Sequence, residues 1–269
     1  MPPAPSSPRR AGRWRWFWLV LCACVAAAGW AVGTGAVEIP ERFDPWAPLD
    51  PKAPPDWLTG FKLARARAEP ARCLAALERT GMQYDLLPDR ETGPGCGFQN
   101  AVRLRSAGVR LNPAAPSLSC PMALSFFMWE THALQPAAEQ RFGQPVVAVE
   151  HLGSYACRNI NRGEGAPPDA GRSASTNPAP QASRSRHATA NALDIAGLTL
   201  ADGRRITVLQ GWPREAVADT AAADNPTALL LRDAHRGACR FFDGVLGPDY
   251  NAVHRDHFHL ETGGYTMCR

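Results

Sequence analysis

The chain reads Ser185-Arg186-His187-Ala188-Thr189-Ala190-Asn191-Ala192-Leu193-Asp194-Ile195 in one segment and His254-Arg255-Asp256-His257-Phe258-His259-Leu260-Glu261 in a second. Four of the seven histidines lie in these two segments. Zinc takes nitrogen and oxygen ligands in proteins, and a catalytic zinc keeps a fourth position for water beside three protein ligands. In a strand, His257 and His259 would share one face. The two segments therefore predict a zinc site built from His187, Asp194 and the histidine run.

Neither pattern is specific by itself, because an isolated H-x-H is more often incidental than metal-binding. Their joint presence, with a further acid at Asp256, is what favours a metal site. The other histidines of the folded part, His132, His151 and His235, have no such neighbours and are interpreted as ordinary structural residues.

The elements around these segments predict an α+β fold with a small antiparallel sheet and flanking helices. Apolar residues at helical spacing predict helices, and alternating or β-branched runs predict strands. The expected helices are Ala71 to Thr80, a buried one from Ser119 to about Leu134 that Pro136 ends or kinks, and about Ala228 to Phe242. The expected strands are Ala101 to Arg105, Val146 to Val149, Ala192 to Ile195, Arg205 to Gln210 and His257 to Glu261, with a hairpin turn at Asp202-Gly203.

The N-terminus predicts export. Residues 1–15 form a basic tail, and residues 16–37 carry no charged side chain. At a rise of about 1.5 Å per residue this run can cross a bilayer of about 30 Å. The arginines precede it, which places the tail in the cytoplasm and the rest of the chain in the periplasm or outside the cell. Its length favours a single-pass membrane anchor, and the small residues Ala31 to Ala36 leave a cleaved signal peptide as the alternative.

Composition agrees with an exported domain. Four of the 29 basic residues and none of the 25 acids lie in the first 37 residues, so the remainder carries no net charge and offers no electrostatic basis for binding nucleic acid. The six cysteines beyond the apolar run are dispersed, which favours three disulfides over a thiolate metal site. We expect Cys239 to pair with Cys268, because that bridge would tie the C-terminal tail to the segment before the histidine run.

Two stretches lack a hydrophobic period. Residues 38–69 contain a proline-rich segment and are expected to be a spacer between the membrane and a domain at 70–269. Residues 161–186 are rich in Gly, Pro, Ser, Ala and Arg and end beside His187. They are either a flap over the site or an insertion without a role.

Longer motifs carry a resemblance to known proteins. The first segment resembles the S-x-H-x-x-G-x-A-x-D pattern of the lysostaphin/D-Ala-D-Ala (LAS) zinc peptidases, and His257-Phe258-His259 resembles their terminal H-x-H. From about Pro55 onward the chain more closely resembles the bacterial extensin-like C-terminal domain family. The motifs that carry this are Cys96-Gly97, Gln135-Pro136-Ala137-Ala138, Gly153-Ser154-Tyr155-Ala156-Cys157-Arg158, the stretch from His187 to Ile195, and Asp256-His257-Phe258-His259.

The resemblance implies a role for each residue. His187, Asp194 and His259 would ligate zinc, and Asp256 would be the general base that takes a proton from the attacking water. His257 would hydrogen-bond the water or the tetrahedral intermediate. Arg158 would stabilise the oxyanion or bind a substrate carboxylate, with a structural salt bridge as its alternative.

Two positions depart from the pattern. The usual glycine is Ala190, and alanine tolerates positive φ poorly. Asp256 and His259 have opposite parity in a regular strand, so both can face a metal only if the strand begins after Asp256.

The resulting expectation is a membrane-anchored, extracytoplasmic zinc hydrolase of the metallopeptidase type that acts on peptidoglycan peptides in the cell wall. Two alternatives remain. One is a non-catalytic cell-wall binding or scaffolding module that retains the zinc-peptidase fold. The other is a purely structural zinc site, which predicts no position open to water.

Overall fold

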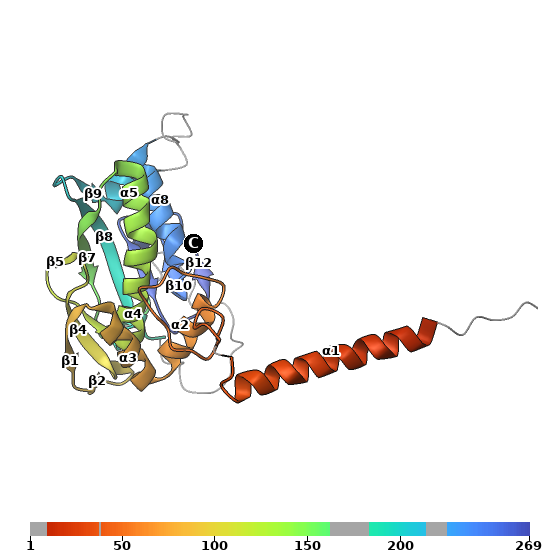
Figure 1. Cartoon of the computed structure of the whole chain (residues 1–269). Helices are drawn as coiled ribbons and strands as arrows, with labels where there is room; N and C mark the ends of the chain where they lie inside the picture. The colour runs from red at the N-terminus through yellow and green to blue at the C-terminus, as the bar shows by residue number, and fades with distance from the viewer. Residues whose placement is uncertain (1–9, 38, 162–182, 214–224) are drawn as a thin grey trace, which may run out of the picture. The chain divides into compact units, whose positions relative to one another are not determined.

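A computed structural model describes residues 10–37, 39–161, 183–213 and 225–269 (Figure 1). The chain divides into two units, Met1–Ala47 and Pro48–Arg269. The expected loop at 161–186 falls almost entirely outside the described residues, so neither of its two interpretations is tested.

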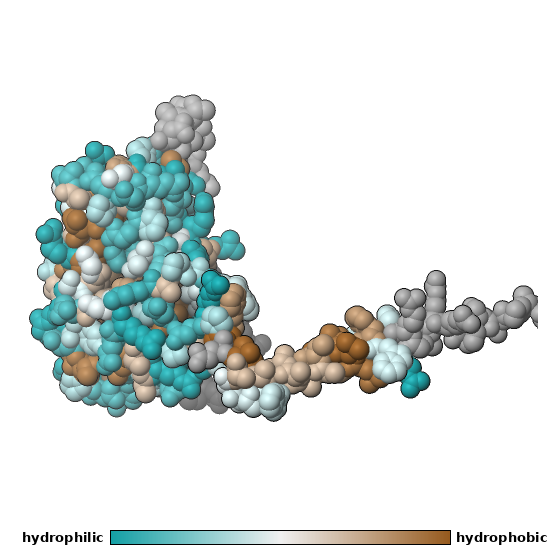
Figure 2. Space-filling model, in the orientation of Figure 1, coloured by the Kyte–Doolittle hydropathy of each residue, from teal (hydrophilic) through white to brown (hydrophobic). Residues whose placement is uncertain are grey.

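The first unit contains one apolar helix, α1 (Arg10–Gly33). Its stretch Trp14–Gly33 is the one helix among the described residues that is long and apolar enough to span a membrane. Apolar residues cover most of its surface in Figure 2. The helix ends before Val37, where the uncharged run stops, because glycines occur at positions 33 and 35 and Gly35 adopts a φ of +74°. The finding confirms an apolar N-terminal helix and leaves the choice between anchor and signal open.

In its described residues, the second unit contains helices and three sheets. Its helices are α2 (Thr59–Ala68), α3 (Pro70–Thr80), α4 (Cys120–Trp129), α5 (Gln135–Phe142), α6 (Val208–Gly211) and α8 (Pro226–Ala238). The two smaller sheets comprise β1 (Gln83–Leu87), β4 (Ala101–Ser106) and β6 (Ser117–Ser119), and β2 (Arg90–Gly93) with β3 (Cys96–Phe98). The largest sheet comprises β5 (Arg110–Asn112), β7 (Val146–Gly153), β8 (Ala192–Leu200), β9 (Arg205–Thr207), β10 (Gly244–Leu246), β11 (Phe258–Glu261) and β12 (Met267–Cys268).

The largest sheet has seven strands in the order β12-β10-β11-β8-β7-β5, with β9 paired to β8. The pairs β5/β7 and β10/β12 are parallel and the others antiparallel. The α+β class is thus confirmed, but the sheet is larger than expected and mixed. The parallel pair β5/β7 joins strands that are separated by α4 and α5 in the sequence, and β12 passes from β11 to the far side of β10. Local turn signals predict neither arrangement.

The central strands separate a core face from a site face. Leu193 and Ile195 of β8 and Phe258 and Leu260 of β11 are buried in the hydrophobic core. The same cluster includes side chains of α4 and α8, and Figure 1 shows these helices alongside the central strands. Side chains at the alternate positions of β8 and β11 therefore point away from this core.

Several boundaries differ from expectation. The strand expected at Arg205 to Gln210 ends at Thr207, whose hydroxyl accepts from Gln210 N and caps α6. The segment 38–69 is not a spacer throughout: the second unit begins at Pro48, and α2 buries Leu63 and Ala66 in the core. The strand expected from His257 begins at Phe258.

Pro136 does not end the helical run, which was one of its two expected effects. The π-helical turn Glu130–Leu134 joins α4 to α5, and Pro136 lies in the first turn of α5. A π-turn shifts the hydrogen-bond phase, so the missing N–H of a proline is accommodated. Gln135 secures the junction by bonding both Val146 N and Val146 O.

Three disulfides are present, as the cysteine spacing indicated: Cys73–Cys120, Cys96–Cys157 and Cys239–Cys268. The expected bridge between Cys239 and Cys268 is confirmed. Together with the apolar N-terminal helix, the disulfides indicate an extracytoplasmic domain.

Candidate metal centre

His187 lies in a short 3-10 turn, Arg186–Thr189. Ser185 caps the turn by accepting from His187 N, and Ala190 closes it at a φ of +55°. The left-handed conformation that the usual glycine would supply is thus adopted by alanine.

Asp194 and His259 are directly opposite each other on antiparallel strands β8 and β11. Opposite side chains on one face of such a pair lie about 5 Å apart at Cβ. Both residues occupy the face that points away from the core, so the sheet register itself brings them together.

The three expected ligands converge. Asp194 Oδ1 lies 2.8 Å from His259 Nδ1, Asp194 Oδ2 lies 3.1 Å from His187 Nε2, and the two nitrogens are 3.3 Å apart. Ligands that share a zinc at about 2.1 Å are separated by about 3–4 Å. Two of the distances fall in that range, and the pair of Asp194 and His259 is slightly closer.

The second nitrogen of each histidine around the centre has an acceptor. Ser154 O lies 3.3 Å from His187 Nδ1, Glu261 Oε2 lies 3.0 Å from His259 Nε2, and Asp256 Oδ1 lies 2.8 Å from His257 Nδ1. Metal-binding histidines are typically fixed in this way by a carbonyl or carboxylate on the far nitrogen. The donor set therefore fits a divalent metal of the zinc type.

The electrostatics of the ligands are coupled. Burial alone would raise the pKa of Asp194, but hydrogen bonds from His187 and His259 and their charges hold that pKa well below its usual value. Burial alone would lower the pKa of His259, but its hydrogen bonds to Asp194 and Glu261 raise that pKa to about 9. The pair thus behaves as a buried carboxylate and imidazolium when no metal is bound.

A cleft of about 870 Å³ reaches these ligands. Its lining includes Asp194, His257 and His259. A purely structural zinc site predicted no such opening, so the cleft counts against that alternative. The exposed guanidinium of Arg158 also lines it and forms no ion pair with a described residue, so the structural salt bridge is not seen in that part of the chain.

Asp256, the expected general base, does not lie with the three candidate ligands. The strand does begin after it, as direct contact with the metal would require. Its side chain is nevertheless 44% exposed and bonds His257, and it is not among the residues that line the cleft. The structure brings Asp256 to His257 rather than to the three ligands.

Three residues of the site were not predicted. His254 lies buried with its ring centroid 5.3 Å from that of His257, and burial, together with the charges of His259 and His257, lowers its pKa to about 4. Glu261 continues the site face of β11 two positions after His259, so strand alternation could have identified it. Asn191 had no sequence signal.

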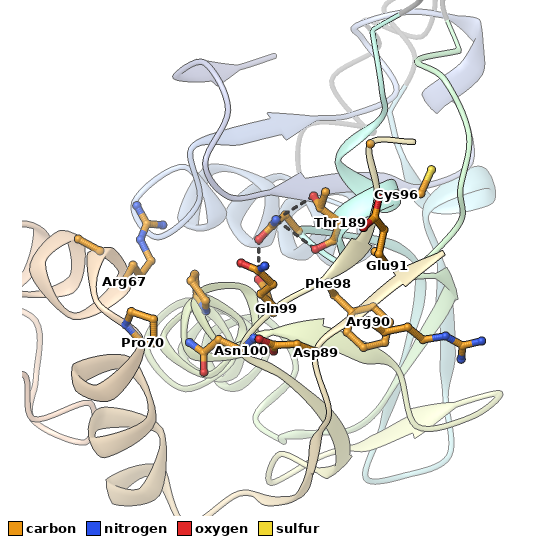
Figure 3. A pocket seen from close by; sticks show the side chains of 16 residues that line it. Arg67, Pro70, Asp89, Arg90, Glu91, Cys96, Phe98, Gln99, Asn100 and Thr189 are labelled. Carbon is orange, nitrogen blue, oxygen red and sulfur yellow. Dashed lines mark hydrogen bonds between the residues drawn. The ribbon is translucent and has the colours of Figure 1, made fainter. Parts of the chain in front are cut away.

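Asn191 holds the ligand turn in place. Its side-chain oxygen accepts from Ser119 and Thr262, and its amide donates to Thr189. Asn191 and Thr189 also line a second cleft, of about 680 Å³, bordered by Arg67 at one end (Figure 3). The turn that carries His187 is thus fastened both to β6 and to the residue that follows β11.

A second group with metal-ligand residue types, His235 with Cys239 and Cys268, is explained otherwise, because the two cysteines form a disulfide. His132, His151 and His235 each contact a backbone carbonyl, which agrees with structural roles.

Comparison with known proteins agrees with the motifs. No curated protein and no solved structure matches the chain. The family model described as "Extensin-like protein C-terminus" matches residues 71–269, which include both ligand segments and all six disulfide cysteines. The chain therefore belongs to the extensin-like protein C-terminus family.

Proposed function

We propose that the chain is a membrane-anchored, extracytoplasmic zinc-dependent hydrolase of peptidoglycan peptides. The observation that carries the proposal is the convergence of His187 Nε2, Asp194 and His259 Nδ1 within 3.3 Å of one another at the wall of an open cleft. Three ligands and an accessible fourth position are the arrangement of a catalytic zinc site.

Zinc at this position would supply a water of lowered pKa and would polarise the scissile carbonyl. The protein's own part is to accept and return the proton. His257 Nε2 faces the ligands, 3.7 Å from Asp194 Oδ1, while its Nδ1 bonds Asp256. We assign the proton acceptor to His257 and the orientation of its ring to Asp256, in place of Asp256 as the direct base.

The substrate class rests on the cleft and on the resemblance to LAS peptidases. Arg158 can pair with a carboxylate of a peptide through its planar guanidinium. Tyr250 and Tyr265 line the same cleft and offer apolar and hydrogen-bonding contacts. A peptide that ends in, or branches at, a carboxylate fits this combination, and the stem peptides of peptidoglycan are of that chemistry.

Zinc content after dialysis tests the centre, with wild type, His187→Ala and the distant His132→Ala as control. We expect about one zinc in wild type and in the control and none in His187→Ala; equal zinc in all three would refute the ligand assignment. Digestion of purified muropeptides then separates hydrolase from binding module, because binding without new products favours the module. Sequencing the N-terminus of the protein from membranes decides whether α1 is retained as the anchor.

A further inference from the structure

We propose that Glu261 is a positioning residue for the metal ligand His259: it accepts the Nε2 proton and so presents Nδ1 to the metal. The inference rests on the metal-binding part of the proposed function. It does not depend on which bond, if any, the protein cleaves.

The hydrogen bonds of His259 require one tautomer for metal binding. A neutral imidazole carries its proton on one nitrogen and accepts with the other. Nε2 lies 3.0 Å from Glu261 Oε2, whereas Nδ1 lies 2.8 Å from Asp194 Oδ1 and 3.3 Å from His187 Nε2. Both nitrogens face a carboxylate, but a metal bound by Asp194 and His187 would take the Nδ1 electron pair. The one proton left on the imidazole is then on Nε2, where Glu261 accepts it.

The position of Glu261 follows from the sheet. It is two residues after His259 on β11 and so lies on the same face. Its side chain is 21% exposed, and it also lines the cleft. The carboxylate therefore flanks the imidazole on the side away from Asp194.

Two glycines make room for this carboxylate. A Cβ at Gly244, which pairs with Glu261 across β10 and β11, would lie 2.5 Å from Glu261 Cγ. A Cβ at Gly264 would lie 2.3 Å from Glu261 Oε1. Neither glycine has a positive φ, so backbone conformation does not require glycine at either position. Space for Glu261 is the requirement that both positions share.

The other proposed histidine ligand, His187, also has an acceptor on the nitrogen that faces away from the metal position. His187 directs Nδ1 at Ser154 O and Nε2 at Asp194. Both ligands thus have the far nitrogen fixed, one by a carbonyl and one by a carboxylate. A carboxylate partner also raises the basicity of the ligating nitrogen, which strengthens metal binding.

The test is the zinc affinity of the full chain in detergent, measured by competition with a chelator. Loss of such a partner typically weakens metal binding by about 10–100-fold, and we expect Glu261→Ala to show this. Glu261→Gln should lose less, because its amide oxygen can still accept from Nε2. Gly244→Ala should weaken binding although Glu261 is intact, because the added methyl displaces it. The matched controls are Glu139→Ala, an exposed position on α5, and Gly60→Ala, where a Cβ meets nothing within 4 Å.

Nitrogen chemical shifts of the chain labelled with ¹⁵N-histidine give a second readout that a merely structural role would not move. With zinc bound, wild type should carry the His259 proton on Nε2. Above about pH 9, where the metal-free imidazole is neutral, Glu261→Ala should move the proton toward Nδ1, which faces Asp194, and Glu261→Gln should restore it to Nε2.

Unchanged zinc affinity in both Glu261→Ala and Gly244→Ala would overturn the assignment. A loss in Glu261→Gln as large as in Glu261→Ala would overturn the hydrogen bond as its cause. Should Glu261→Ala fail to fold, Gly244→Ala and Glu261→Gln still decide the question. Absence of zinc from wild type would instead refute the metal centre, so the two failures are distinguishable.

Discussion

Asp256 and His257 form a carboxylate–imidazole pair, with Oδ1 2.8 Å from Nδ1, at the edge of the ligand cluster. The pair is made by adjacent residues in the turn that precedes β11, so its geometry depends on where the strand begins. A strand that included Asp256 would direct the two side chains to opposite faces. The short turn instead places the Asp256 carboxylate within hydrogen-bond distance of the imidazole of its neighbour His257.

This pairing makes a kinetic prediction. We expect His257→Ala to lower kcat by about 10²–10⁴-fold, the usual contribution of a general base. Asp256→Ala should also lower kcat, but the double variant should be no slower than His257→Ala, because Asp256 acts through His257. The measurement is muropeptide turnover by the four proteins at saturating zinc.

If Asp256 were itself the base, the two losses would multiply and His257→Ala would be the milder variant. Zinc affinity is the control, since neither residue is among the proposed ligands and both single variants should retain the metal.

The pH dependence of zinc binding follows from His259. Its pKa of about 9 in the metal-free protein means that it is protonated at neutral pH, and zinc must displace that proton. Asp194, whose pKa is held below its usual value, is already ionised and releases none. We therefore expect affinity to rise about tenfold per pH unit up to about pH 9 and then to level off.

Calorimetry in buffers of different ionisation enthalpy counts the released protons directly, and at pH 7.5 we expect at least one per zinc. Affinity that stays constant between pH 7 and 9, with no proton released, would contradict the coupling of Asp194 and His259. The raised pKa of His259 also predicts how stability changes with pH in the metal-free protein. Its contribution to the free energy of unfolding is fully present below about pH 6.5 and is lost as the pH rises through about 9.

Local patterns and the family resemblance singled out the residues that converge in the candidate metal centre. His257 and His259 are two apart, and Asp194 lies in an alternating run whose apolar members Leu193 and Ile195 enter the core. The contact between Asp194 and His259 is not local. It depends on a strand register across 65 residues of chain, which spacing does not encode. The same alternation along β11 could have predicted that Glu261 shares a face with His259. Asn191 could not be predicted in this way, because its contacts come from three separate parts of the chain.

Pro136, which was expected to end or kink its helix, shows what local patterns do not predict. Proline in a helical run normally predicts a helix end, because it removes a hydrogen bond and clashes with the preceding turn. The π-turn at Glu130–Leu134 relieves both effects. Glu130 is a buried polar residue in this turn: burial raises its pKa, although hydrogen bonds from Gln135 and Thr131 lower it. The residue pattern does not predict a buried polar contact of this kind.

Ala190 supplies a stability prediction. A non-glycine residue in the left-handed region costs about 1–2 kcal/mol, and Ala190 adopts a φ of +55°. Ala190→Gly removes that cost and so stabilises the fold. The substitution also destabilises the fold, because a buried methyl group is lost and the unfolded chain gains conformational freedom. The matched control is Ala192→Gly, at an equally buried strand position without positive φ, which should destabilise by about 1 kcal/mol.

We expect the free energy of unfolding of Ala190→Gly to exceed that of Ala192→Gly by about 1–2 kcal/mol in urea titrations. Equal values would mean that the turn carries no conformational strain at position 190.

The bridge between Cys239 and Cys268 should affect substrate binding more than metal binding. It joins Cys268 of β12 to Cys239 at the end of α8, and the C-terminal segment places Tyr265 and Met267 in the wall of the cleft. None of the proposed ligands lies on β12. Replacing both cysteines by serine opens a loop of 29 residues and should cost about 3–4 kcal/mol of stability. At a temperature where the variant stays folded, we expect KM for a muropeptide to rise several-fold while zinc affinity is unchanged. A variant with unchanged KM would show that β12 does not contribute to the substrate site, and one that loses zinc as well would show that the tail supports the whole centre.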